Sequence, residues 1–137
     1  METIRSSFLT LIAALIILQS SEAMAWVYFF NVKVVNNSGQ DIKIRRITAK
    51  AKTNLNIKEC EKYDGGLLIP AGSSTVSPRC AVATQKWQRQ IMVEFRCTSN
   101  GAVRNLYFPR GSNKFFARDH AQKNGDKYVT KIKAGDC

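Results

Sequence analysis

The stretch that decides the fold is residues 91–108, IMVEFRCTSNGAVRNLYF. Alternate residues at its start would share one face of a strand, and these are Ile91, Val93, Phe95 and Cys97. Residues 98–101 then read Thr-Ser-Asn-Gly, and Asn-Gly is a strong signal for a tight hairpin turn. Residues 102–108 return as a second strand. The stretch therefore predicts an antiparallel hairpin with one apolar face that a second layer must cover.

Strand signals flank this hairpin on both sides, separated by turn clusters of Asn, Gly and Pro. The apolar runs expected to form strands are 26–35, 42–45, 67–69, 114–117 and 127–133. Residues 50–66 are polar and contain Gly65-Gly66, which predicts a long loop, and residues 73–89 are expected to give an edge strand and a loop. No stretch of ten residues beyond position 25 has a helical period. The pattern predicts an all-β fold, a small antiparallel β-sandwich in one domain, residues 26–137.

Composition limits the classes of protein to which the chain can belong. The chain has 137 residues, a net charge of +11 and 45% hydrophobic residues, which excludes a disordered protein. The first 25 residues hold one base and two acids, so residues 26–137 carry 20 bases, 8 acids and a net charge of +12. A charge of this size favours anionic partners.

Residues 1–25 are interpreted as a cleaved secretory signal peptide. A weakly basic start is followed by an apolar run of 11 residues, Phe8–Leu18, and then by Ala23-Met24-Ala25, which fits the small-x-small cleavage rule. Eleven residues span about half of a bilayer core, which argues against a membrane anchor. We therefore expect a secreted, extracellular protein that begins at Trp26 and has no membrane span.

The four cysteines all follow this leader, and an even number in a secreted chain predicts two disulfides. Four cysteines allow three pairings. We favour Cys97–Cys137, because each residue ends a predicted strand, and Cys60–Cys80, because these two flank one loop-rich segment. The spacing needed for a zinc site is absent, so neither a metal nor a cofactor is predicted.

A basic stripe is the strongest candidate for a binding site. It comprises five cations within ten residues: Lys43, Arg45, Arg46, Lys50 and Lys52. Positions 43 and 45 fall on the outward face of a predicted strand, where clustered charge attracts anions such as sulfated glycans, acidic polysaccharides or lipids. Nucleic acid is the least favoured, since no motif interleaves aromatic residues with the bases. The alternative is a solvated surface that only aids solubility.

Two further patterns suggest chemistry. Glu94, Arg96 or Arg104, and His120 are the residue types of a small secreted ribonuclease, in which a carboxylate and an imidazole exchange a proton with the substrate. The simpler interpretation is a cross-strand ion pair and a loop histidine. Asn36-Asn37-Ser38 is an N-glycosylation sequon in a predicted surface turn, so Asn36 is a candidate glycan acceptor.

The order of these features resembles the plant self-incompatibility protein family. Four pieces carry the resemblance, in chain order: Val32–Asn37 (VKVVNN), Leu67–Ser73 (LLIPAGS), Ile91–Cys97 (IMVEFRC) and Tyr128–Cys137 (YVTKIKAGDC). The chain departs from the family in Ile44–Thr53, which has neither the usual cysteine nor an acidic run. The resemblance implies a small basic secreted β-sandwich that acts as an extracellular signalling ligand without catalytic activity.

The sequence thus predicts a monomeric, secreted, non-catalytic ligand or signalling protein that binds a cell-surface receptor or an anionic extracellular polymer. A small secreted ribonuclease or cationic toxin is the alternative from another class. A surface protein that self-associates through an edge strand is a third.

Overall fold

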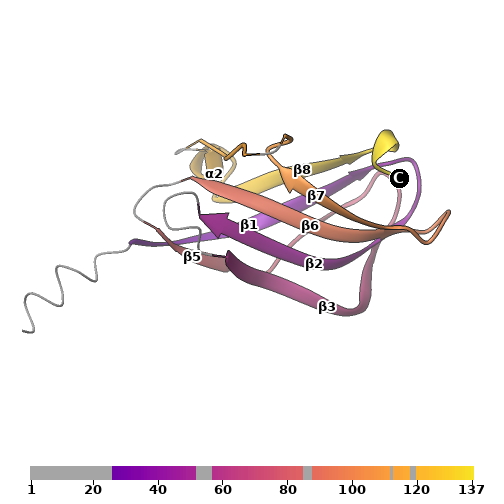
Figure 1. The fold of residues 1–137 in the computed structure, drawn as a ribbon, viewed down its shortest axis with the longest axis horizontal. Coiled ribbons are helices and arrows are strands. Elements are labelled where there is room, and N and C mark those ends of the chain that lie inside the picture. Colours follow the sequence, from indigo (N-terminus) through magenta and orange to yellow (C-terminus); the bar gives the residue numbers. More distant parts are fainter. Residues whose placement is uncertain (1–25, 52–56, 85–87, 112, 118–119) are drawn as a thin grey trace, which may run out of the picture.

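The computed structural model describes residues 26–51, 57–84, 88–111, 113–117 and 120–137. Within them the chain is mostly strand with almost no helix, as predicted (Figure 1). The elements are β1 (Trp26–Asn37), β2 (Ile42–Ala51), β3 (Ile57–Ile69), β4 (Ser74–Val76), β5 (Cys80–Thr84), β6 (Arg89–Cys97), β7 (Val103–Phe108), α2 (His120–Lys123), β8 (Lys127–Lys133) and the 3₁₀ turn η1 (Ala134–Asp136). The expected signal peptide, residues 1–25, lies outside the described residues.

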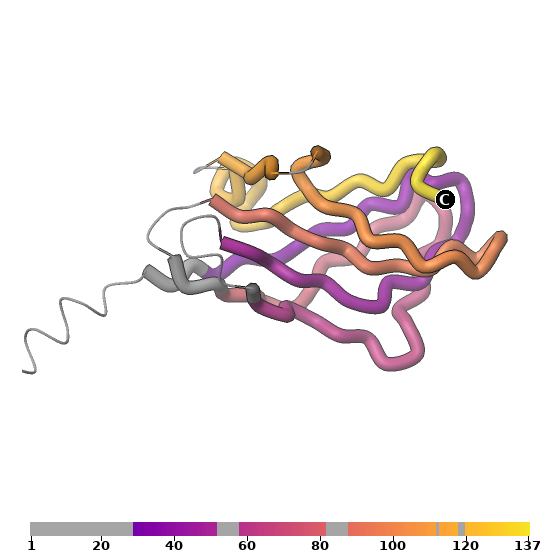
Figure 2. Tube along the Cα trace, viewed as in Figure 1, coloured from indigo at the N-terminus to yellow at the C-terminus, as the bar shows by residue number. Residues whose placement is uncertain are grey.

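The strands form two sheets. In one, β4, β5 and β8 each pair with β1; in the second, the order is β3-β2-β6-β7. All of these pairs are antiparallel except β1–β8, which is parallel and sets Asn31–Asn37 against Lys127–Lys133. The predicted antiparallel β-sandwich is confirmed, and β1–β8 is the one parallel pair among the described strands; the chain crosses from one sheet to the other between β7 and β8 (Figure 2).

The core lies between the sheets and is built from the faces that alternation predicts. Ile91, Val93, Phe95 and Cys97 are all fully buried on β6, and Tyr128, Thr130 and Ile132 are buried on β8. Phe30 and Tyr128 pack edge to face across β1 and β8, with ring centroids 4.9 Å apart. Burial raises the pKa of Tyr128 to about 12, so its phenol stays protonated at neutral pH.

One expected connection is largely strand, and one expected strand is not a strand. The predicted loop 50–66 is wrong, since β2 continues to Ala51 and β3 occupies Ile57–Ile69. Among the described strands β3 pairs with β2 alone, so it is an edge strand, and a half-exposed edge tolerates the polar sequence that suggested a loop. The predicted strand 114–117 reduces to one isolated bridge, between Phe116 and Arg89.

Both predicted disulfides are confirmed, and each joins one sheet to the other. Cys60 on β3 is bonded to Cys80 on β5, and Cys97 at the end of β6 is bonded to Cys137, just beyond β8 and η1. The loops that they close span 20 and 40 residues, for which chain-entropy arguments give about 3–4 kcal/mol each. The disulfides therefore fix the two sheets against each other.

The sequon asparagine is a structural residue. Asn36 is fully buried, and its Nδ2 donates to the carbonyls of Gln40, at 2.7 Å, and Ile69, at 2.9 Å. Its Oδ1 accepts from the backbone N–H and the hydroxyl of Ser38. A glycan on Nδ2 would have to break these contacts and enter the core, so this geometry argues against glycosylation of Asn36 in the folded protein.

Replacing Asn36 by alanine should destabilise the fold strongly. Two carbonyls and one N–H would lose their buried partner, which predicts a loss of about 2–4 kcal/mol in the free energy of unfolding. Asn37→Ala is the matched control, because Asn37 is exposed and should change stability by less than about 0.5 kcal/mol. Urea unfolding measures both. Equal effects of the two substitutions would contradict this role for Asn36.

A clamp at the same end of the sandwich holds the loop after β7 to the C-terminal turn. Arg110 forms a two-pronged ion pair with Asp136, with Nη1 2.8 Å from Oδ1, and also donates to the carbonyl of Lys131 at 2.7 Å. Asp136 further accepts from the backbone N–H of Lys133 at 2.7 Å. The hydrogen bond from Arg110 is the main cause that lowers the pKa of Asp136 below its usual range. Arg110 thus has a structural partner within the chain.

The clamp should make stability depend on pH in the acid range. Since the pKa of Asp136 is lower in the folded state, its contribution is complete above the unfolded pKa of about 3.9 and disappears as the pH falls through the folded pKa. Asp136→Asn should therefore cost about 1–2 kcal/mol at pH 7 and less near pH 2. Urea unfolding at both pH values tests this. The control Asp126→Asn removes an exposed carboxylate and should have little effect at either pH.

Candidate functional site

The candidate site lies on the outer face of the β3-β2-β6-β7 sheet and begins with a bulge in β2. Ile44 is opposite Phe95 of β6 and Arg46 is opposite Glu94, so Arg45 is an extra residue without a cross-strand partner in the ladder. The bulge keeps Ile42, Ile44 and Ile47 buried on one face although their spacing changes from two to three. As a result, the consecutive residues Arg45 and Arg46 both lie on the outer side.

The edge strand β3 departs from β2 at the same point. Ile44 is opposite Leu67 and Arg46 is opposite Lys62, so the four residues Tyr63–Gly66 face Arg45 alone. Gly65 and Gly66 have φ values of +75° and +84°, which glycine adopts without strain. A Cβ on Gly66 would lie 3.1 Å from Cβ of Lys43, whereas a Cβ on Gly65 would meet nothing within 4 Å. The two irregularities open the sheet into a hollow.

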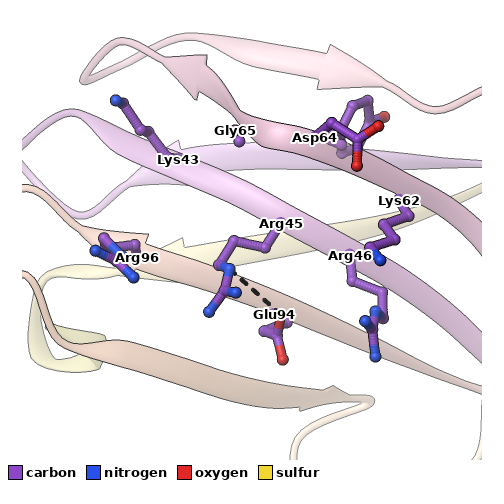
Figure 3. A pocket seen from close by; sticks show the side chains of 10 residues that line it. Lys43, Arg45, Arg46, Lys62, Asp64, Gly65, Glu94 and Arg96 are labelled. Carbon is purple, nitrogen blue, oxygen red and sulfur yellow. Dashed lines mark ion pairs between the residues drawn. The ribbon is translucent and has the colours of Figure 1, made fainter.

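This hollow, called here the basic hollow, has a volume of about 430 Å³. Its cationic lining comes from three strands: Lys43, Arg45 and Arg46 of β2, Lys62 of β3 and Arg96 of β6. Asp64 and Glu94 are its two carboxylates, and Tyr63 and the two glycines complete it. Figure 3 shows Arg45 reaching Glu94 near the centre, with Lys43 and Arg96 to one side and Arg46 and Lys62 to the other.

Two of the five cations have a carboxylate partner. Nε of Arg45 is 3.8 Å from Glu94 Oε2, and Nε of Arg46 is 3.3 Å from Glu59 Oε2. Within the described residues no ion pair engages Lys43, Lys62 or Arg96. Burial, followed by the charge of Glu61, raises the pKa of Tyr63, so its phenol keeps the proton that it can donate. The hollow therefore offers an anion three cations free of carboxylates and a hydroxyl donor.

The structure divides the predicted basic stripe. Lys43, Arg45 and Arg46 meet in the basic hollow, Lys50 lies further along β2 beside a second hollow, and Lys52 lies outside the described residues. Sequence reasoning missed Lys62 as a member of the site and assigned Tyr63–Gly66 to a loop. Two features of the sequence could have indicated the site. Arg45-Arg46 between two isoleucines indicates a bulge, and Gly65-Gly66 inside a strand indicates a second irregularity.

The residues of the ribonuclease alternative do not share one site. Glu94 and Arg96 line the basic hollow, whereas His120 lines a separate hollow with Phe108, Phe116 and Lys131. The His120 ring stacks on Phe116 with centroids 4.4 Å apart, and burial, with the charge of Lys123, lowers its pKa. Phe116 itself is buried in the core.

Two other features are absent from the described residues. No group of three or more His, Cys, Asp or Glu side chains could hold a metal ion in these ranges. None of the described helices is long and apolar enough to span a membrane. Comparison of the chain with known protein families, curated proteins and solved structures found no match.

Substitution of the two glycines should separate backbone strain from crowding in the hollow. Gly65→Ala and Gly66→Ala each place a Cβ at positive φ, which costs about 1–2 kcal/mol. Gly66→Ala must also displace Lys43, so it should cost at least about 1 kcal/mol more. Urea unfolding of the two variants gives the difference. Equal costs would mean that β3 does not approach Lys43 as described.

Proposed function

We propose that the chain is a secreted, non-catalytic ligand or signalling protein, similar in kind to plant self-incompatibility proteins, that binds an anionic extracellular partner through the basic hollow. The partner is an acidic polymer or the acidic surface of a cell-surface receptor. Two disulfides are compatible with an oxidising, extracellular environment. The resemblance in the order of sequence features supports a ligand rather than an enzyme.

The observation that carries the proposal is that three cations line the basic hollow without a carboxylate partner among the described residues. Lys43, Lys62 and Arg96 come from three different strands, and the cross-strand register sets Lys43 directly opposite Arg96. Charges that only aid solubility gain nothing from such proximity, since like charges on neighbouring strands repel. An anion in the hollow would remove this repulsion and be held by groups that the sheet has already positioned.

The interior of the hollow makes the electrostatic attraction stronger than on an open surface. Surface charges are screened beyond about 8 Å at physiological ionic strength, but Lys43 and Arg96 lie opposite each other on neighbouring strands, which are about 5 Å apart. Clefts lined by one sign of charge also concentrate the field and accelerate the arrival of an anion. The remaining carboxylates, Asp64 and Glu94, leave the lining with a net charge of +3, from five cations and two acids.

Neutralising the three free cations should abolish the attraction. The triple variant Lys43→Gln, Lys62→Gln, Arg96→Gln should bind immobilised heparin and polygalacturonate at least about tenfold more weakly at 0.15 M salt, and its affinity should fall less steeply with salt, because fewer counterions are exchanged. Isothermal titration or surface binding at several salt concentrations measures both quantities.

The matched control removes the same charge elsewhere. Lys114, Lys123 and Lys131 are exposed and lie outside the basic hollow, so the triple substitution of these lysines by glutamine should lower affinity by less than about threefold through the overall charge. Equal losses in the two variants would show that the net charge binds polyanions and that the hollow is not a site. No loss in either variant would overturn the proposal.

A further inference from the structure

The outer face has a second hollow, which continues the basic hollow along β2 and β6. It has a volume of about 270 Å³ and is lined by Thr48, Lys50, Gln90, Met92 and Tyr107, a set called here the Tyr107 shelf. Thr48, Met92 and Tyr107 lie opposite one another on β2, β6 and β7. The next outward-facing row of the same ladder contains Arg46 and Glu94 of the basic hollow. The two hollows are therefore adjacent rows of one sheet face.

The chemistry of the shelf differs from that of the basic hollow. Tyr107 is 48% exposed on the edge strand β7, so much of its ring is open to solvent beside the thioether of Met92. Lys50 adds one cation, with no carboxylate partner among the described residues, and Thr48 adds a hydroxyl. A ligand that lies on the shelf must present an apolar flank, polar groups and negative charge together.

We propose that the anionic partner is an extended acidic polysaccharide that lies across both the basic hollow and the Tyr107 shelf. This inference rests on the proposed function and names its ligand class. Sugar rings carry apolar C–H faces that pack on aromatic side chains, together with hydroxyls and sulfate or carboxylate groups. From Lys43 to Lys50 the face extends about 20 Å along β2, which suits an oligomer of several sugars rather than a single anion.

Two other extended polyanions fit this face less well. An acidic peptide that adds to a sheet pairs with a free edge, and the edges here are β3 and β7, whereas the two hollows extend along β2 and β6, which are paired on both sides. Single-stranded nucleic acid requires successive aromatic platforms, one for each base. Among the described residues the shelf contributes one exposed aromatic ring, Tyr107. Charge complementarity and the single ring together favour the polysaccharide.

The test compares short and long oligosaccharides. Sulfated and galacturonate oligomers of two and of ten sugars are titrated into the folded protein and into the variant Lys50→Gln, Tyr107→Ala. Ten sugars can occupy both sites, so they should bind the unaltered protein at least about tenfold more tightly than two sugars do. The shelf variant should lose about tenfold for the longer oligomers and less than twofold for the disaccharides.

Controls separate this inference from the proposed function. The variant Lys50→Gln, Tyr107→Phe keeps the aromatic ring and should recover part of the affinity for ten sugars. Urea unfolding verifies that each variant is folded.

If the Lys43, Lys62 and Arg96 variant loses binding but the shelf variant does not, the basic hollow stands and the shelf is not part of the site. If polyglutamate or single-stranded DNA of equal charge binds with the same dependence on Tyr107, the polysaccharide is the wrong class. Stronger binding of sulfated oligomers than of galacturonates, or the reverse, identifies the acidic group.

Discussion

Strand β2 has to keep its isoleucines in the core on both sides of one extra residue, Arg45. The position and shape of the basic hollow depend on this constraint. Ile44 and Ile47 are three positions apart, so simple alternation would expose one of them, and burying a side chain of this size is worth about 1.5–3 kcal/mol. The bulge at Arg45 restores both to the core and leaves two adjacent arginines outside. The same packing requirement that stabilises the sandwich thus creates the centre of the basic hollow.

The disulfides and the sheet edges determine how firmly this arrangement is held. Cys60 fastens the edge strand β3 to the opposite sheet just before β3 departs from β2 at Tyr63–Gly66. An edge strand with two successive glycines would otherwise be free to separate, because among the described strands it has one hydrogen-bonded neighbour. The hollow is therefore open in shape but fixed in position, which reduces the entropy that a ligand must lose on binding.

Sequence reasoning reached the parts of the fold that depend on local alternation and missed those that depend on which strands become neighbours. The hairpin of β6 and β7 and the buried face of β8 were predictable, because apolar residues recur there with a period of two. Strand β3 was not predictable, because it is an edge strand with a polar sequence. The parallel pairing of β1 with β8 was not predictable either, because it joins residues about a hundred positions apart. For the same reason Lys43 and Arg45 could be placed outward, whereas Lys62 joined them only through the register. The sequon at Asn36 matched a surface motif, although its amide serves to bind buried carbonyls.

The parallel pairing of β1 with β8 has a consequence for how the chain acquires its structure. β1 is the first described strand to leave the ribosome, yet the partner of its second half, Lys127–Lys133, is the last. Contacts between residues this distant in sequence form late and slow the folding of β-rich domains. Until then an apolar strand containing Val32 and Val34 has one unpaired edge, which is a template for association with other chains. Synthesis at high concentration therefore carries a risk of aggregation that the finished sandwich, with β1 covered on both edges, no longer has.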